Sequence, residues 1–195
     1  MDEKDVGQNS DFVKPSEQFK VADRRGMVQV YTGNGKGKTT ASLGLGLRAL
    51  GHGWKVYMIQ FMKGRINYGE LEAVKNLPSF TIEQFGRPDF VDKENPAQVD
   101  IDFAQQGLAR AKEVVSGGKY DMVILDEMNV ALDYKLVPEE EVLAMIKNRP
   151  EHVEIVLTGR NAPESILAIA DLVSRVGEEK HPYQKGVQAR EGIEF

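Results

Sequence analysis

The sequence predicts an α/β protein built on a mostly parallel β-sheet with helices on both faces. Two observations lead to this prediction. Five short apolar runs rich in β-branched residues are typical of buried strands. Longer amphipathic stretches, typical of helices, alternate with them, and parallel strands need such crossover connections. A chain of 195 residues is long enough for one domain with a substantial core.

The expected elements follow one another from Met27 onward. Strands are expected at 27–31, 54–61, 80–85, 122–125 and 153–157, and helices at 38–50, 69–76, 96–116, 138–147 and 163–170. Three of these helices open with a proline, which suits a first turn because the N–H groups there have no partner within the helix. The charged stretch 86–95, before the long helix, is a loop long enough to carry a function.

The first 25 residues contain eleven charged and few apolar side chains. Such a segment cannot bury enough surface to order itself, so we predict a flexible segment at 1–25 and a single domain at 26–195. Two hypotheses stay open for the segment. It is an ordinary disordered leader, or it becomes ordered against a partner subunit through its apolar residues Phe12, Val13, Phe19 and Val21.

Composition excludes several functions. Because the chain has no cysteine, it cannot hold a disulfide, a thiolate zinc site or an iron–sulfur cluster, and it has no cysteine nucleophile. Its net charge of -5 argues against a broad basic face for nucleic acid. No uncharged run reaches the length of a membrane span, so we expect a soluble, cytoplasmic protein without nucleic-acid or membrane partners.

A glycine-rich loop, Gly33-Asn34-Gly35-Lys36-Gly37-Lys38-Thr39-Thr40, directly follows the first strand. Glycines let successive backbone N–H groups approach an anion, and the following helix N-terminus adds partial positive charge. Lys38 supplies a mobile charge and Thr39 a hydroxyl for Mg²⁺. The usual G-x-x-x-x-G-K-[ST] spacing is not met, because Thr32 takes the place of the first glycine. A structural glycine turn is the alternative, whereas a dinucleotide fingerprint would need glycine at Lys38.

The apolar run at 122–125 is followed by two carboxylates, Asp126 and Glu127. We expect this strand to lie beside the first one and to deliver an acid to the metal held by the loop. Glu127 either polarises a water for attack on the γ-phosphate or joins the magnesium shell, and the spacing leaves both open. A helix-capping pair without a ligand is a third alternative. Loop and strand together predict a P-loop NTPase-like (RecA-like) fold that binds a nucleotide.

Four further segments extend this pattern: Arg48–Gly53, Gln60–Gly64, Thr158–Pro163, and the tail from Lys180 to Phe195. Together with the loop and Leu125-Asp126-Glu127, they make the chain resemble the P-loop type of ATP:corrinoid adenosyltransferases, the cob(I)alamin adenosyltransferases of the cobalamin pathway. The resemblance covers roughly residues 27–195 and includes the displaced first glycine of the loop.

This resemblance implies transfer of the 5′-deoxyadenosyl group of ATP to the Co(I) of a reduced corrinoid of the cob(I)alamin, cobinamide or cobyrinic acid diamide type, with release of tripolyphosphate. Co(I) attacks C5′, so no general base is needed, in agreement with only three histidines and no nucleophile–base pair. It also implies reversed ATP, with the loop on the terminal phosphate. The residues alone leave open a kinase or ATPase acting at the γ-phosphate, and a non-catalytic nucleotide switch.

The resemblance also implies roles for individual residues. Lys36, Lys38 and Glu127 are the expected catalytic residues, and Thr39, Glu127 and Asp126 are expected to hold Mg²⁺ or Mn²⁺. Arg160, at the end of the last predicted strand, is expected to contact phosphate or a corrin side chain, with a solvated surface arginine as the alternative. The expected binding set for ATP and corrinoid is Gly33, Asn34, Gly35, Lys36, Gly37, Lys38, Thr39, Thr40, Arg160 and Phe90.

The corrin side of the sequence departs from the family pattern. Better-known relatives carry a Phe-Thr-Trp segment before the long helix, whose rings displace the lower cobalt ligand. Here that stretch offers Phe90, with Val91 in place of a ring, and Trp54 lies elsewhere. The resemblance further implies a homodimer and an electron donor, of flavoprotein or another type, for reduction of Co(II) to Co(I). Since the remaining body is small for two substrates, we expect residues 1–25 to help cover the active site.

Overall fold

The computed structural model describes residues 24–64 and 68–195. Within them the chain forms a six-stranded sheet in the order β3-β2-β4-β5-β1-β6. Every neighbouring pair is parallel, which confirms the predicted sheet. The strands are β1 Val28–Thr32, β2 Val56–Phe61, β3 Phe80–Phe85, β4 Met122–Asp126, β5 Glu154–Thr158 and β6 Leu172–Arg175.

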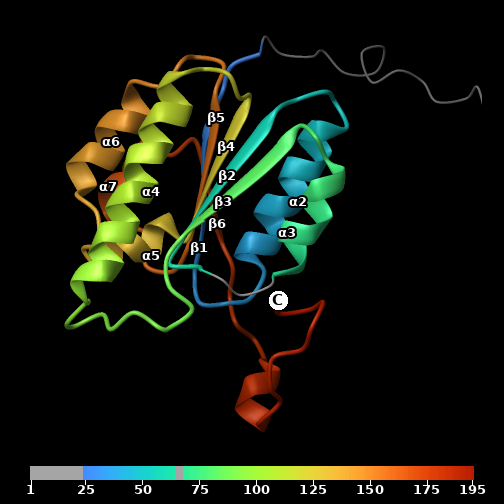
Figure 1. Ribbon diagram of the computed structural model, residues 1–195, viewed down its shortest axis with the longest axis vertical. Coiled ribbons are helices and arrows are strands. Elements are labelled where there is room, and N and C mark those ends of the chain that lie inside the picture. The colour runs from blue at the N-terminus through green and yellow to red at the C-terminus, as the bar shows by residue number, and fades with distance from the viewer. Residues whose placement is uncertain (1–23, 65–67) are drawn as a thin grey trace, which may run out of the picture.

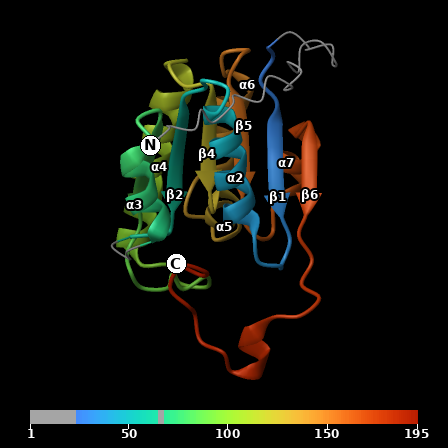
Figure 2. The ribbon, with the colours of Figure 1, turned by 90° about the vertical axis from the view of Figure 1, so that its right-hand side faces the viewer.

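Helices cover both faces of the sheet, as predicted (Figure 1). One face is covered by α2 (Lys38–Leu50) and by α3 (Gly69–Ala73), which continues into the 3₁₀ turn η1 (Val74–Asn76). The other face is covered by α4 (Gln98–Ser116), α5 (Met128–Asp133), α6 (Glu139–Lys147) and α7 (Glu164–Ile169). A second 3₁₀ turn, η2 (Pro182–Lys185), lies in the C-terminal tail below the sheet (Figure 2).

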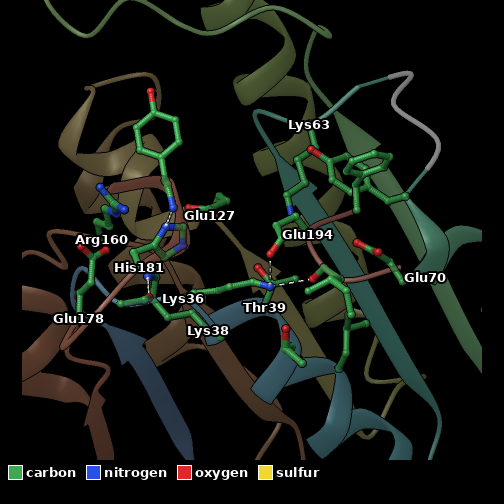
Figure 3. A pocket seen from close by; sticks show the side chains of 18 of the residues that line it. Lys36, Lys38, Thr39, Lys63, Glu70, Glu127, Arg160, Glu178, His181 and Glu194 are labelled. Atoms are coloured by element: carbon green, nitrogen blue, oxygen red, sulfur yellow. Dashed lines mark hydrogen bonds and ion pairs between the residues drawn. The ribbon is translucent and has the colours of Figure 1, made fainter. Parts of the chain in front are cut away.

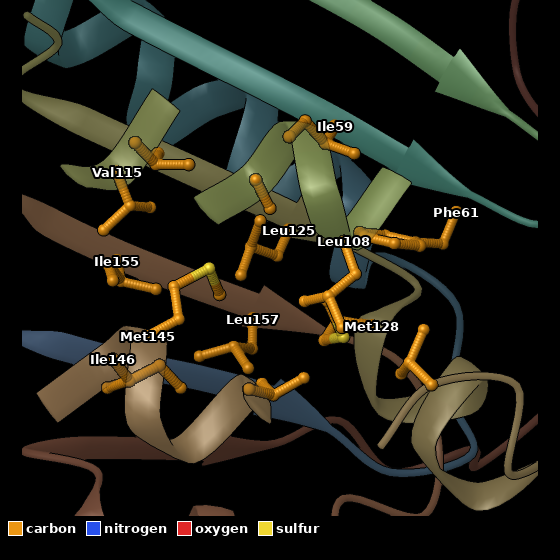
Figure 4. Close-up of a cluster of buried hydrophobic side chains, with 14 of the residues drawn as sticks. Ile59, Phe61, Leu108, Val115, Leu125, Met128, Met145, Ile146, Ile155 and Leu157 are labelled. Carbon is orange, nitrogen blue, oxygen red and sulfur yellow. The ribbon is translucent and has the colours of Figure 1, made fainter. Parts of the chain in front are cut away.

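Two apolar clusters, one on each face, hold these layers together. The larger cluster fills the space between the sheet and helices α4 to α7, with Leu125, Leu157 and Met128 fully buried within it (Figure 4). The smaller cluster includes Met58 and Ile124 and lies under α2. Because β2, β4 and β5 are buried along their whole length, their sequences are mostly apolar, with polar residues only near the strand ends. This packing fixes the carboxyl ends of the strands, from which the site is built.

Several details differ from the sequence predictions. Pro138 and Pro163 are N-caps, and Pro96 lies before the N-cap of α4, so none of the three prolines is in a first turn. The edge strand β6 was not expected, because four residues with exposed Leu172 and Val173 give too short an apolar pattern. The acid strand β4 does not lie beside β1: Ile155 of β5 pairs with Val28 on one side and Val123 on the other. That expectation was therefore wrong, because the motifs of two strands do not fix whether the strands are adjacent in the sheet.

The described chain begins at the amino ends of the strands, opposite the glycine-rich loop. Arg24 forms an ion pair with Asp121, just before β4, at 2.6 Å and stacks over Trp54. Residues 1–23 of the predicted segment 1–25 lie outside the described residues. The expected role of this segment in covering the active site stays a prediction. Within the described part of the chain, no helix combines the length and apolar character needed to cross a membrane.

Candidate active site

The glycine-rich loop turns away from β1 against the backbone that follows β6. Gly33 has a φ of 98°, and a Cβ there would lie 2.5 Å from the carbonyl oxygen of Val176. A Cβ on Gly35 would lie 2.3 Å from the carbonyl oxygen of Gly177. Both positions therefore need glycine, for close approach of two backbones and, at Gly33, also for its left-handed conformation. The Gly35 N–H donates to Val176 at 2.9 Å, so this one amide of the expected anion cradle already has a partner.

Helix α2 starts directly after the loop and presents its N-terminus to the pocket. Its N-cap, Gly37, has a φ of 117° and supplies no side-chain cap. The N–H groups of the first turn therefore lack an intrahelical or side-chain capping partner, and they are available to an anion. Thr39 and Thr40, on this first turn, line the pocket together with Lys38.

The side chain of Lys38 folds back onto the glycine-rich loop. Its Nζ donates to the carbonyl oxygens of Gly33 and Gly35, at 2.8 Å each. Burial lowers the pKa of Lys38, and the carboxylate of Glu127 opposes that shift. The ammonium group thus sits within the loop that is expected to bind phosphate.

Asp126, at the end of β4, is fully buried and accepts four hydrogen bonds. Its Oδ1 accepts from Thr39 Oγ1 at 2.8 Å and from Thr158 Oγ1 at 2.7 Å. Its Oδ2 accepts from Lys63 Nζ at 2.7 Å and from Gln60 Nε2 at 3.3 Å. Both oxygens are therefore engaged by protein donors, and this carboxylate acts as a hub for the carboxyl ends of β2, β4 and β5.

Glu127 follows Asp126 in a left-handed conformation, with a φ of 60°. Such a backbone is strained for a residue with a Cβ, and here the N–H of Glu127 is fixed by Thr158 Oγ1 at 3.0 Å. The strained turn points Asp126 into the protein and leaves Glu127 to line the pocket. Burial, followed by repulsion from Asp126, raises the pKa of Glu127.

The donor set here fits Mg²⁺. Thr39 gives its hydroxyl hydrogen to Asp126, which leaves its oxygen lone pairs for a cation, and Glu127 adds a carboxylate. Among the described residues, no group of three or more His, Asp or Glu side chains is close enough to form a metal site by itself. A cation would therefore need oxygens from a bound phosphate as well, as is usual for Mg²⁺.

Lys36 and Arg160 lie on opposite sides of the loop (Figure 3). Lys36 Nζ donates to the carbonyl oxygen of Ile193 at 2.7 Å and lies 3.3 Å from Glu194. Arg160 Nη2 donates to the carbonyl oxygen of Asn34 at 3.2 Å. The structure thus brings all of the sequence-predicted loop residues, Arg160 and both acids to the carboxyl ends of the strands.

Three predicted site residues, Gly33, Asp126 and Phe90, do not line the pocket. Gly33 and Asp126 directly precede residues that do, whereas the Phe90 side chain is 102% exposed. It lies in a loop fixed on both sides: Arg87 makes a two-pronged ion pair with the buried Asp100 on α4, and Lys93 binds Asp133 on α5. Phe90 therefore lies on an exposed loop, and its expected contact with a corrin stays a prediction.

The pocket, of about 770 Å³, also contains residues that were not among the predicted site residues. Lys63 follows β2, and Tyr68 and Glu70 lie at the start of α3. Position at the carboxyl end of a parallel strand was the available signal for Lys63. The tail contributes a further set, for which no periodic pattern exists: Glu178, His181, Tyr183, Gln184, Gly192, Ile193, Glu194 and Phe195.

Comparison with known proteins gives a consistent result. Residues 24–195 match the family model of the ATP:corrinoid adenosyltransferase BtuR/CobO/CobP. The chain is 36% identical to the corrinoid adenosyltransferase of Escherichia coli K12 over 89% of this chain and 87% of that protein. It is 35% identical to the corrinoid adenosyltransferase CobA of Salmonella typhimurium, with the same coverage. Among solved structures, the flagellar accessory protein FlaH of Methanocaldococcus jannaschii matches with a TM-score of 0.47 and 15% identity, over 78% of this chain and 71% of that one.

Proposed function

Because the chain belongs to the ATP:corrinoid adenosyltransferase BtuR/CobO/CobP family, we propose that the pocket at its glycine-rich loop is where ATP gives up its 5′-deoxyadenosyl group. Family membership makes the chain a transferase for the ATP-dependent adenosylation of corrinoids in cobalamin biosynthesis. The observation that carries the assignment to this pocket is the convergence of Lys38, Thr39 and Glu127 around one cavity.

The proposed reaction needs no proton transfer. The Co(I) electron pair of the substrate forms a bond to C5′, the C5′–O bond breaks, and its electron pair leaves with the oxygen of tripolyphosphate. The protein's tasks are then to orient the two substrates and to stabilise the charge of the leaving group. Lys36, Lys38 and the uncapped amides of α2 are suited to the second task, because they place positive charge on one wall of the pocket.

A divalent cation is part of the proposal. Thr39 and Glu127 would hold Mg²⁺ or Mn²⁺, and Asp126 would support them from behind, since its own oxygens are taken by four protein donors. The cation would supply charge neutralisation to the polyphosphate. Thr39 is oriented for this role by its hydrogen bond to Asp126, which needs no ligand to form.

The test compares products. Incubation of the protein with Mg-ATP and chemically reduced cob(I)alamin is expected to give a light-sensitive alkylcobalt spectrum, and phosphorus NMR is expected to show tripolyphosphate. Inorganic phosphate or ADP would instead indicate a kinase or ATPase acting at the γ-phosphate. Nucleotide binding without any product would indicate a switch protein.

We also propose that Phe90, on its exposed loop, contacts the corrin ring of the second substrate. Phe90→Ala is expected to slow adenosylation when the assay starts from cob(II)alamin and a reductant, while ATP binding stays unchanged, because Phe90 lies outside the pocket. Unchanged turnover would remove this role. Val99→Ala, which also truncates an exposed apolar side chain near this loop, is a matched control.

The remaining partners belong to the proposal as well. A homodimer is supported by the exposed Leu172 and Val173 on the edge strand β6, which offer apolar surface to a second copy. Light scattering of the purified chain tests this. An electron donor, of flavoprotein or another type, is needed to supply Co(I), and a cytoplasmic location remains an expectation.

A further inference from the structure

Lys63 is a partly buried cation that none of the roles above uses. Its side chain is 14% exposed, and its Nζ lies 2.7 Å from Asp126 Oδ2. It nevertheless lines the same cavity as the glycine-rich loop, which it enters from the end of β2 (Figure 3). Burying a lysine is costly unless its charge is paired, so this position requires a specific arrangement around it.

The backbone around Lys63 is fixed by close contacts. Met62, directly before it, has a left-handed φ of 57°, and its N–H donates to the carbonyl oxygen of Phe85 at 2.9 Å. A Cβ on Gly64 would lie 2.0 Å from the carbonyl oxygen of Gly86, so these two turns touch backbone to backbone. The strained turn and the tight contact both hold Lys63 at the carboxyl end of β2.

Lys63 and Thr39 lie at the two ends of one carboxylate. Thr39 binds Oδ1 of Asp126, Lys63 binds Oδ2, and both residues face the cavity. An ammonium group has three N–H donors, and Asp126 takes one of them. The remaining N–H donors of Lys63 can bind an anion in the cavity that it lines.

We propose that Lys63 is a catalytic residue that contacts the phosphate chain of ATP from the Asp126 side and stabilises the leaving tripolyphosphate. This inference rests on the proposed function. Lys63 donates hydrogen bonds to phosphate oxygens, and no proton changes place. Lys63, at the end of β2, then adds a third cation to Lys36 and Lys38 of the glycine-rich loop around the polyphosphate.

The competing role for Lys63 is structural: it only neutralises the buried Asp126. Lys63→Met alone does not separate the two roles, because it leaves Asp126 charged and unpaired in the interior. The double variant Lys63→Met/Asp126→Asn removes both charges and keeps the volume, so it avoids that penalty. The comparison that matters is this double variant against Asp126→Asn alone.

The experiment measures binding of inorganic tripolyphosphate to the full chain by calorimetry, with EDTA present to exclude metal effects. The double variant is expected to bind at least about tenfold more weakly than Asp126→Asn, the loss expected for one charge-assisted contact. Lys63→Arg, which keeps the charge, is expected to bind within a few-fold of the wild-type chain. Lys75→Met is the matched control, because Lys75 pairs with Glu72 on the exposed side of the α3–η1 segment and does not line the cavity.

Equal affinity of the double variant and Asp126→Asn would overturn the proposal and leave Lys63 as a partner of Asp126 only. The adenosylation assay of the wild-type chain is scored separately. If it yields no alkylcobalt product, the proposed function fails, while the tripolyphosphate comparison still reports whether Lys63 contacts polyphosphate.

Discussion

Thr39 and Asp126 lie 87 positions apart in the chain, and Thr39 Oγ1 donates a hydrogen bond to Asp126 Oδ1 at 2.8 Å. The same oxygen accepts from Thr158 on β5, the strand that separates β4 from β1. One buried carboxylate at the end of β4 therefore links helix α2, which follows the glycine-rich loop, to strand β5. These hydrogen bonds form without a ligand, and they lead to the first prediction.

Asp126→Ala is expected to lower the free energy of unfolding by about 3–5 kcal/mol, because it leaves Lys63 buried without its partner and removes the acceptor of three other donors. Urea unfolding followed by circular dichroism measures the change. Asp89→Ala is the control, since the Asp89 side chain is 74% exposed and its loss should cost no more than about 0.5 kcal/mol. Similar effects of the two substitutions would contradict the hub role of Asp126.

Gly35→Ala is expected to destabilise the chain and to abolish ATP binding, because the new Cβ would meet the carbonyl oxygen of Gly177 at 2.3 Å and push the loop off its support. Gly44→Ala makes the same chemical change on the exposed side of α2, where nothing lies within 4 Å of the Cβ. That variant should gain about 0.5–1 kcal/mol of stability and bind ATP normally. Thermal unfolding and nucleotide titration of both variants test the pair, and loss of binding in Gly44→Ala would count against this account.

Glu194→Gln is expected to strengthen the binding of tripolyphosphate by less than about tenfold, because Lys36 would no longer be paired with a carboxylate at 3.3 Å. Hydrogen bonds from the Arg190 side chain and backbone lower the pKa of Glu194 to about 2. A depressed carboxyl pKa means that the charge is present above it and lost only as the pH falls through it. The affinity difference should thus be constant from about pH 5 to pH 8, and calorimetry at both values checks this. Weaker binding by Glu194→Gln would show that the tail helps to hold the anion.

Asp133→Asn is expected to loosen the loop that carries Phe90. Asp133 accepts from Lys93 in that loop at 2.8 Å and from Asn161, next to Arg160, at 2.9 Å. Hydrogen exchange at residues 86–97 should become faster, and the KM for the corrinoid should rise while the KM for ATP stays the same. Asp102→Asn, on the exposed side of α4, provides the control.

The pH dependence of the same variant gives an independent check. Burial raises the pKa of Asp133, but the hydrogen bonds from Lys93 and Asn161 outweigh it, so the pKa lies below the usual value. The stability that the charged form contributes is therefore present above the usual aspartate pKa and is lost as the pH falls through the depressed one. The stability difference between wild type and Asp133→Asn should disappear only in that acidic range, and a difference independent of pH would contradict the assignment.

Local patterns predicted most of the elements and the loop. The strand, glycine loop and helix from Val28 to Leu50 are contiguous, so their order in the chain is also their order in space. The four-residue β6 gave no such pattern, because its apolar residues are exposed at the sheet edge. The tail residues that line the cavity were missed for a related reason, since their positions depend on where the chain returns after β6.

The sequence by itself determined the α/β alternation, the glycine-rich loop and the pair of acids, because hydrophobic periodicity and glycine spacing act over a few residues. Only the tertiary structure decided that β5 separates β4 from β1, that Lys63 binds Asp126, and that the segment ending in Phe195 passes over Lys36. Each of these depends on strand order and on contacts between distant segments. Local patterns do not encode such contacts, whereas packing of the whole chain selects them.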